Sequence, residues 1–156
     1  MIGSTSCAYE SICIAYGGLP TTIEYRKITN EHPDVKTITV DEYERNPIVF
    51  DSAFSISSFE HSGLGRYGDP LDPNGDILSM QNTKKMIKKD GLLFLAVPIG
   101  ADIIAFNEHR VYGRKRFKRL VEGWKIIKSF GFNEIYFDEI PDKNAYRQPI
   151  FVLKNI

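Results

Sequence analysis

Short apolar runs and longer amphipathic stretches alternate along the chain, a pattern that predicts strands separated by helices. Helical spacing of apolar residues predicts helices over 6–16, from a cap at 72–74 to about 89, and over 115–130. The first of these helices carries Ala8, Ile12 and Ala15 on one apolar face. Continuous apolar runs, or runs rich in β-branched residues, predict strands over 21–25, 37–40, 48–56, 92–97, 134–137 and 150–153.

The order of these elements predicts an α/β fold. Strands that alternate with helices are typical of a parallel, doubly wound sheet with helices on both faces. The last two predicted strands have no helix between them, only a turn-rich link that contains Pro141, Asp142 and Asn144. We therefore expect these two strands to pair antiparallel, at the C-terminal end of an otherwise mostly parallel sheet.

Composition predicts one soluble globular domain. The 156 residues are 42% hydrophobic and 26% charged, and 20 basic residues balance 20 acidic ones. Because the net charge is zero, we expect a small-molecule partner and neither nucleic acid nor a membrane. The basic cluster Arg114–Arg119 is most simply a solvated helix face. The most apolar stretch, 92–106, is shorter than the roughly 20 residues of a membrane helix.

Targeting and cysteine patterns predict a cytoplasmic protein. The N-terminus has no basic segment followed by an apolar one, as a signal peptide would have. The two cysteines, Cys7 and Cys13, are too few for a disulfide framework or a zinc site. We therefore expect a reduced protein without a metal.

Candidate cofactor residues follow the ends of the predicted strands, where ligands lie in open α/β sheets. Gly3 and Ser4 form a turn directly before a helix, where free backbone N–H groups can bind an anion; a simple serine cap is the alternative. Glu24 lies 21 residues after Gly3 (24 − 3), near the interval at which an acid binds ribose; a solvated glutamate is the alternative. Asp41 follows the next strand. The single glycine of the turn argues against a dinucleotide.

Several segments carry a family resemblance. The stretch Phe50–His61 resembles the "FD…S…EH" segment of small-molecule methyltransferases, and Met86–Pro98 resembles their passage from a lysine-rich helix end through a glycine into a strand. The stretch Ser57–Asp76 is similar to the signature of an uncharacterised family, a domain of unknown function known in part from nematodes. That family resembles class I S-adenosylmethionine-dependent methyltransferases. Nearly the whole chain fits it, including the segments 2–10, 106–113 and 122–124.

The resemblance implies a Rossmann-like methyltransferase-type fold with S-adenosylmethionine as its cofactor. Gly3 and Ser4 would bind the amino-acid end of the cofactor, and Glu24 would bind its ribose. Asp41 would accept from the adenine amino group, and Ser57 is a further cofactor contact.

Candidate substrate residues lie in loops expected at the same edge of the sheet. His61 is the candidate general base, because a histidine near its ordinary pKa suits proton removal from an acceptor hydroxyl. A loop histidine that only hydrogen-bonds backbone is the alternative. Position alone suggests further acceptor contacts: Arg66, Tyr67, Asp69, His109 and Arg110.

Two departures from the family bear on activity. The first strand, which is central in a methyltransferase-type sheet, is almost absent, because the chain starts at Met1-Ile2. The turn after it has one glycine where active methyltransferases usually have two or three. We expect a single domain over 1–156 that lacks the family's N-terminal part. Two hypotheses follow: a methyltransferase for a small or sugar-like acceptor, or a non-catalytic relic that serves as a binding or interaction module.

Overall fold

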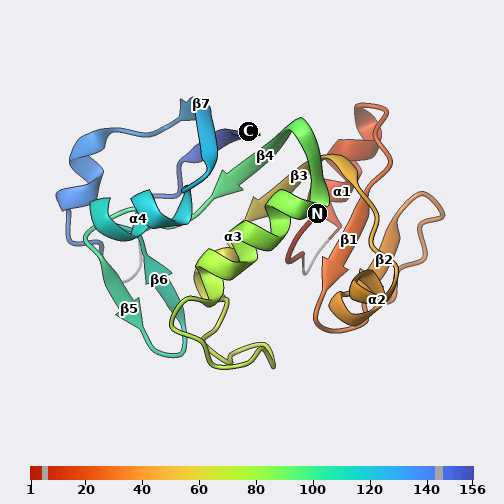
Figure 1. Ribbon diagram of the computed structural model, residues 1–156, viewed down its shortest axis with the longest axis horizontal. Coiled ribbons are helices and arrows are strands. Elements are labelled where there is room, and N and C mark those ends of the chain that lie inside the picture. Colours follow the sequence, from red (N-terminus) through yellow and green to blue (C-terminus); the bar gives the residue numbers. More distant parts are fainter. Residues whose placement is uncertain (5–6, 143–145) are drawn as a thin grey trace.

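Two central sheets organise the protein in the computed structural model, which describes residues 1–4, 7–142 and 146–156 (Figure 1). In the smaller sheet, β1 (Thr21–Glu24) pairs parallel with β2 (Lys36–Thr39). A separate hairpin consists of β5 (Ile103–Ala105) and β6 (His109–Val111). The larger sheet has the order β3-β4-β8-β7 and consists of β3 (Phe50–Ile56), β4 (Ile87–Ala96), β8 (Ile150–Asn155) and β7 (Trp124–Phe130).

Strand direction changes across the larger sheet. β3 and β4 are parallel, whereas β8 runs antiparallel to both of its neighbours, β4 and β7. The four-stranded sheet is therefore mixed, although the alternation of strands and helices predicted a mostly parallel one. The change of direction follows from the chain's path, because no α-helix lies between β7 and β8 in the described residues.

The first three residues lie between the two sheets. Ile2 forms a parallel bridge with Ile23 of β1, and its amide donates to the carbonyl of Phe54 in β3 over 2.9 Å. The Ile23 amide donates to Met1 O over 2.9 Å. The strands thus form the series β2-β1-(1–3)-β3-β4-β8-β7, in which residues 1–3 supply a very short central segment.

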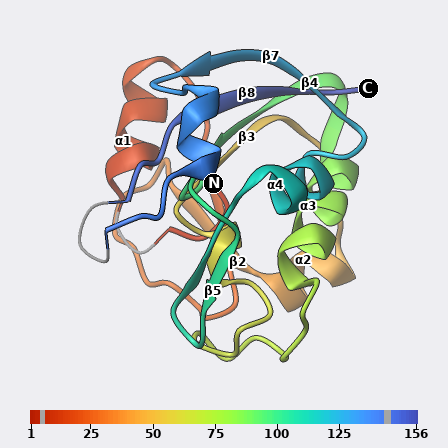
Figure 2. The same ribbon diagram turned by 90° about the vertical axis from the view of Figure 1, so that its left-hand side faces the viewer.

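Helices lie on both sides of the larger sheet. α3 (Gly75–Met86) and α4 (Arg114–Leu120) lie on one side of it, and α1 (Ala8–Ala15) lies toward the other (Figure 2). The short α2 (Val40–Arg45) follows β2 directly and begins with a capping box between Thr39 and Glu42. The 3-10 turn η1 (Phe59–His61) follows β3. Within the described ranges, we find no helix with the length and apolar character needed to cross a lipid bilayer.

The hydrophobic core lies where β4 and β8 meet α3 and α4. Leu93 and Leu95 of β4 are completely buried, because β4 has a strand on either side. The predicted buried strand over 92–97 is therefore confirmed. Removal of this apolar surface from water is the main force that holds the sheet and helices together. Further core side chains come from both helices and from β7 and β8: Ile77, Met80, Phe117, Leu120, Trp124, Phe151 and Leu153.

The predicted helix over 115–130 is wrong in its second half. α4 ends at Leu120, and β7 begins at Trp124. Gly123 lies between these elements with φ +80°, a conformation that glycine adopts without strain. β7 pairs with β8 from Trp124 to Phe130, and this long-range pairing overrides the local helical spacing of apolar residues.

Three other elements differ from the predictions. Residues expected as a strand form the 3-10 turn η2 (Glu134–Asp138), so β8 takes β7 as its antiparallel partner. α3 ends at Met86, and the residues up to 89 belong to β4. α1 confirms the first helix, but it buries Glu10, while Ile12 on the expected core face is 55% exposed. The predicted start of the first helix at residue 6 and the predicted turn residue Asn144 lie outside the described part of the chain.

Candidate functional site

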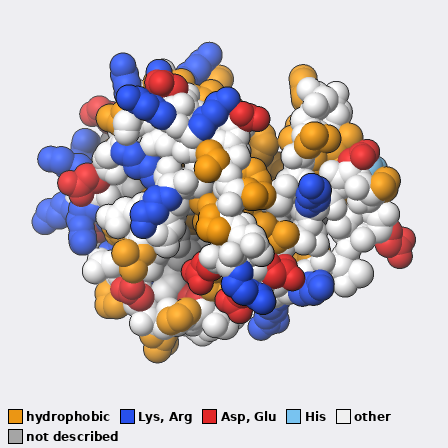
Figure 3. Space-filling model, turned by 45° about the vertical axis from the view of Figure 1, so that its right-hand side comes forward, with side chains coloured by type: hydrophobic (Ala, Val, Ile, Leu, Met, Phe, Trp, Pro, Cys, Tyr) orange, Lys and Arg blue, Asp and Glu red, His pale blue; other side chains and the backbone are white. Residues whose placement is uncertain are grey.

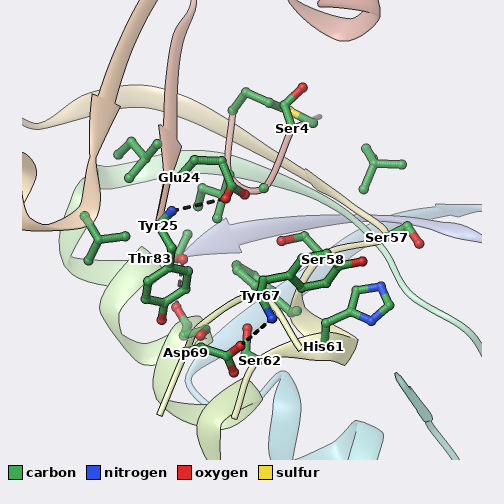
Figure 4. Close-up of a pocket in the computed structure, with 18 of the residues that line it drawn as sticks. Ser4, Glu24, Tyr25, Ser57, Ser58, His61, Ser62, Tyr67, Asp69 and Thr83 are labelled. Atoms are coloured by element: carbon green, nitrogen blue, oxygen red, sulfur yellow. Dashed lines mark hydrogen bonds between the residues drawn. The ribbon is translucent and has the colours of Figure 1, made fainter. Parts of the chain in front are cut away.

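A cavity of about 500 Å³ opens between the β1–β2 unit, the N-terminal turn and α3. The space-filling view shows a hollow beside this unit, along which hydrophobic side chains gather (Figure 3). On α3, one helix face lines the cavity with Ser79, Asn82, Thr83 and Met86. The opposite wall comes from the turn at residues 1–4, the end of β1 and the segment after β3 (Figure 4).

Many of the residues singled out in the sequence meet at this cavity. They come from the N-terminal turn, the end of β1 and the segment 57–69, which are far apart in the chain. Their roles toward a ligand stay predictions. The candidate residues that line the cavity are Gly3, Ser4, Glu24, Ser57, His61, Tyr67 and Asp69.

Gly3 lies where the N-terminal turn meets both neighbouring strands. Its φ of +70° is in the left-handed region, which favours glycine. A β-carbon at this position would overlap the Ser58 hydroxyl and come within 3.5 Å of Glu24 Oε1. Glycine therefore allows the turn to pack against Ser58, and it places backbone atoms beside the Glu24 carboxylate in one corner of the cavity.

Glu24 ends β1 and is half-buried at the cavity wall. Its Oε2 accepts a hydrogen bond from the Tyr25 amide over 3.1 Å. Burial raises the pKa of Glu24, while the Tyr25 amide and the nearby Arg26 act in the opposite direction. The result is a carboxylate at a strand end that can accept hydrogen bonds from ligand hydroxyls.

A buried acid, Glu10, holds the N-terminal turn in place. It is 2% exposed and accepts hydrogen bonds from Thr22 Oγ1 of β1 over 2.5 Å and from Ser4 Oγ over 3.3 Å. These bonds connect α1, β1 and the turn. The Ser4 hydroxyl is thus bound to Glu10, and Ser4 lines the cavity from this fixed position.

A second buried acid, Glu60, lies behind the wall formed by the segment after β3. Its carboxylate Oε1 accepts a hydrogen bond from Ser57 Oγ over 2.7 Å, and Gln148 Nε2 lies 3.5 Å from the same oxygen. Burial raises the pKa of Glu60 to about 7, and the Ser57 hydrogen bond opposes this rise. Glu60 was not predicted as a site residue, although its position next to the candidate base His61 pointed to it.

His61 lies beside Glu60 at the cavity wall. Its Nδ1 is 2.5 Å from the carbonyl oxygen of Glu108, so Nδ1 carries the proton and donates, and Nε2 of the neutral ring has the free lone pair. Nε2 is 3.8 Å from Glu60 Oε1. Burial lowers the pKa of His61, and the Glu108 carbonyl opposes this effect. The neutral form, which a general base requires, is therefore favoured.

Asp69 organises the loop that carries Tyr67. The carboxylate accepts hydrogen bonds from the backbone amides of Gly63 over 2.6 Å, Gly65 over 3.2 Å and Tyr67 over 3.2 Å. Asp69 is 7% exposed and lines the cavity. The Tyr67 ring makes an edge contact with the His61 ring, with 5.4 Å between centroids.

Four candidate residues do not line the cavity. Asp41 is exposed in the first turn of α2, although Val40 before it reaches the cavity. Arg66 is exposed, with its guanidinium 5.8 Å from the Tyr67 ring. The His109 ring lies behind that of His61, with 6.3 Å between centroids. Their contacts with a ligand stay predictions.

Arg110, the fourth, is completely buried. Its guanidinium donates to the carbonyls of Ser62 over 2.5 Å and Asp72 over 3.3 Å, and its Nε lies 3.8 Å from Asp76 Oδ2. These contacts attach the loop after η1 to the β5–β6 hairpin. Arg110 has no exposed surface to offer a substrate.

The basic cluster on α4 is largely bound by neighbouring side chains. Arg116 forms an ion pair with buried Asp76 over 2.5 Å, and Arg114 pairs with Asp138 over 2.8 Å. Arg119 donates to the Asn74 side chain over 3.2 Å. The cluster therefore stabilises the packing of α4 against its surroundings.

The cavity itself has an acidic and aromatic character. Its described lining contains the carboxylates of Glu24 and Asp69 but no lysine or arginine side chain. The rings of Tyr9, Tyr25 and Tyr67 are partly exposed there. Such a cavity favours a neutral or cationic ligand with a flat ring and disfavours a phosphorylated one. Tyr9, Tyr25 and the α3 face were not selected from the sequence, because nothing local indicates which side chains meet there.

Comparison with known proteins identifies the family and the fold. The family model described as "Caenorhabditis protein of unknown function, DUF268" matches residues 6–152. The structure is similar to the crystal structure of TehB from Haemophilus influenzae, a methyltransferase, with a TM-score of 0.51 and 12% sequence identity. The match covers 89% of this chain and 50% of TehB, so the chain spans about half the length of that protein. No curated protein matches the chain. The fold is thus methyltransferase-like.

Proposed function

We propose that this chain, which belongs to the DUF268 family, is an S-adenosylmethionine-dependent methyltransferase that acts on a small or sugar-like acceptor. The observation that carries the proposal is the corner of the cavity where Gly3 and Glu24 meet. There a glycine turn and a strand-end carboxylate lie side by side at the carboxyl end of β1. Ligands of open α/β sheets bind at this edge.

The fold supports the proposal. Residues 1–3 lie between β1 and β3, which is the position of the central first strand in a methyltransferase-type sheet. On this basis the two sheets are parts of one Rossmann-like sheet with a shortened centre. The similarity to TehB supports this description of the fold. The reaction itself has to be tested by experiment.

The residues at the cavity fit S-adenosylmethionine better than a nucleotide with phosphates. The cofactor carries a sulfonium cation, and the described lining offers carboxylates and tyrosine rings without a lysine or arginine side chain. When bound, S-adenosylmethionine supplies a methyl group activated for displacement. Glu24 would accept from the ribose hydroxyls, and the backbone at Gly3 and Ser4 would bind the amino-acid end. Ser57 and Asp41 are further candidates for cofactor contacts.

On the acceptor side, His61 is the candidate base. Its protonated Nδ1 is held by the Glu108 carbonyl, which leaves Nε2 to take up a proton from an acceptor hydroxyl. The neighbouring Tyr67 and the side chains of Asn82 and Gln148 can donate or accept hydrogen bonds at the same cavity. These groups suit a polar, uncharged acceptor such as a sugar.

Calorimetric titration with S-adenosylhomocysteine tests the cofactor site. We expect micromolar binding by the unaltered protein and loss of binding in Glu24→Ala. The control is Glu31→Ala, since Glu31 is exposed and does not line the cavity. An acceptor screen follows if binding is found. If the folded protein does not bind, the enzyme proposal fails, and the fold serves instead as a binding or interaction module.

A further inference from the structure

Glu60 is buried behind the residues that line the cavity and contacts them from the protein interior. Its side chain is completely buried, and its Oε1 accepts from Ser57 over 2.7 Å and lies 3.8 Å from His61 Nε2. Gln148 Nε2 is 3.5 Å from the same oxygen. Because Ser57, His61 and Gln148 all line the cavity, Glu60 contacts three wall residues at once.

The second carboxylate oxygen of Glu60 is in an unusual position. Oε2 is buried and has no hydrogen-bond partner among the described residues. An ionised carboxylate in such a place is costly, whereas the protonated acid carries no charge that burial penalises. This agrees with the pKa of Glu60, which burial raises to about 7. Glu60 therefore changes its charge in the neutral pH range.

We propose that Glu60 and His61 hold one proton between them near neutral pH, and that Glu60 is the positioning residue which prepares His61 to accept a proton from an acceptor hydroxyl. With one proton, the pair is either an uncharged acid beside a neutral imidazole or a carboxylate beside an imidazolium. The form of the pair without this proton is the one that accepts: when its neutral His61 Nε2 takes up the hydroxyl proton, the ionised Glu60 carboxylate balances the new positive charge, and the pair then holds one proton. Only the role toward the acceptor rests on the proposed function.

Other charged groups face the Glu60–His61 pair and influence where its proton lies. Around His61, Arg66 and His109 oppose protonation, and Asp69 favours it. On the inner side of Glu60 lies a buried group in which Arg110 pairs with Asp76 and both lie close to Tyr112. The Arg110 guanidinium also donates to the Glu60 carbonyl over 3.4 Å.

Histidine NMR titration tests the pair without a cofactor. The chain has three histidines, His32, His61 and His109, so each imidazole can be assigned by substitution. In Glu60→Gln, which keeps a hydrogen-bonding side chain of the same size, the His61 titration midpoint should fall by about one pH unit, because a nearby carboxylate favours imidazolium. The distant His32 serves as the control and should not change. An unchanged His61 midpoint in folded Glu60→Gln would overturn the proposal.

A second measurement covers the case in which Glu60→Gln does not fold. The carboxyl carbon of Glu60 can be followed by 13C NMR in the unaltered protein and in His61→Gln. We expect a midpoint near 7 that rises in His61→Gln, because the imidazolium no longer stabilises the carboxylate. A midpoint that does not respond to His61→Gln contradicts the shared proton. Failure to bind S-adenosylhomocysteine would instead contradict the proposed function and leave these titrations unaffected.

Discussion

Gly3 and Ser58 approach each other so closely that a β-carbon on residue 3 would overlap the Ser58 hydroxyl. The contact joins the N-terminal turn to the segment after β3, and Glu24 lies next to it. A change at Gly3 should therefore affect both the stability of the protein and the cofactor corner of the cavity.

Gly3→Ala should lower the free energy of unfolding more than Gly17→Ala does. Both glycines have left-handed φ angles, +70° and +78°, but a β-carbon at Gly17 meets nothing within 4 Å. Gly17→Ala thus measures only the free-energy cost of an alanine in the left-handed backbone conformation, about 1–2 kcal/mol. Urea unfolding measures the difference, and calorimetry should show that only Gly3→Ala loses S-adenosylhomocysteine binding. Equal effects at the two positions would contradict the close contact.

Glu60 should make the protein less stable as the pH rises from about 4.5 to about 7. Its pKa is raised in the folded state, so the folded protein binds the proton more tightly than the unfolded chain does. This stabilisation is fully present when the pH is below the pKa of the unfolded chain, and it is lost as the pH rises through the pKa of the folded state. A rise from 4.5 to about 7 corresponds to at most about 3–4 kcal/mol. The free energy of unfolding of the unaltered protein and of Glu60→Gln should be measured across this pH range. The advantage of the unaltered protein over Glu60→Gln should shrink or reverse as the pH rises. A difference that stays constant with pH would contradict the raised pKa of Glu60.

Asp76→Asn should be strongly destabilising, by about 3–5 kcal/mol, because it leaves buried Arg110 and half-buried Arg116 without their carboxylate. The matched control is Asp51→Asn, which breaks the exposed pair with Lys88. That change should have little effect, since exposed pairs are screened by water. Chemical denaturation of both variants measures the contrast. Similar stabilities would show that the buried group does not depend on Asp76.

Asp69→Ala should loosen the loop that carries Tyr67 and weaken ligand binding at the cavity. Three backbone amides lose their acceptor, which costs about 1–3 kcal/mol for each donor left buried and unpaired. Asp72→Ala is the control, because among the described residues that side chain accepts from the exposed Asn74 amide alone. Hydrogen exchange of the Gly63 amide reports on the loop. Unchanged protection in Asp69→Ala would contradict this role.

Local pattern was enough to place several parts of the protein. The apolar run that contains Leu93 and Leu95 predicts a buried strand, because a strand with neighbours on both sides must be apolar. Glu24 and Gly3 could be selected because strand ends and glycine turns leave recognisable residues at regular intervals. The structure brings both residues to one cavity, and their roles toward a ligand await the binding experiment.

Long-range contacts account for the features that the pattern missed. Residues from Trp124 to Phe130 have helical spacing, but they become β7 because β8, whose paired residues lie 20 to 31 positions later, supplies their hydrogen-bond partners. Glu60 looks like an ordinary loop glutamate in the sequence. Its raised pKa comes from burial, and its carboxylate lies near residues as distant in the chain as Gln148; neither feature is encoded in its immediate neighbours. Strand pairing and desolvation both depend on which distant segments meet, so they become visible only in the folded chain.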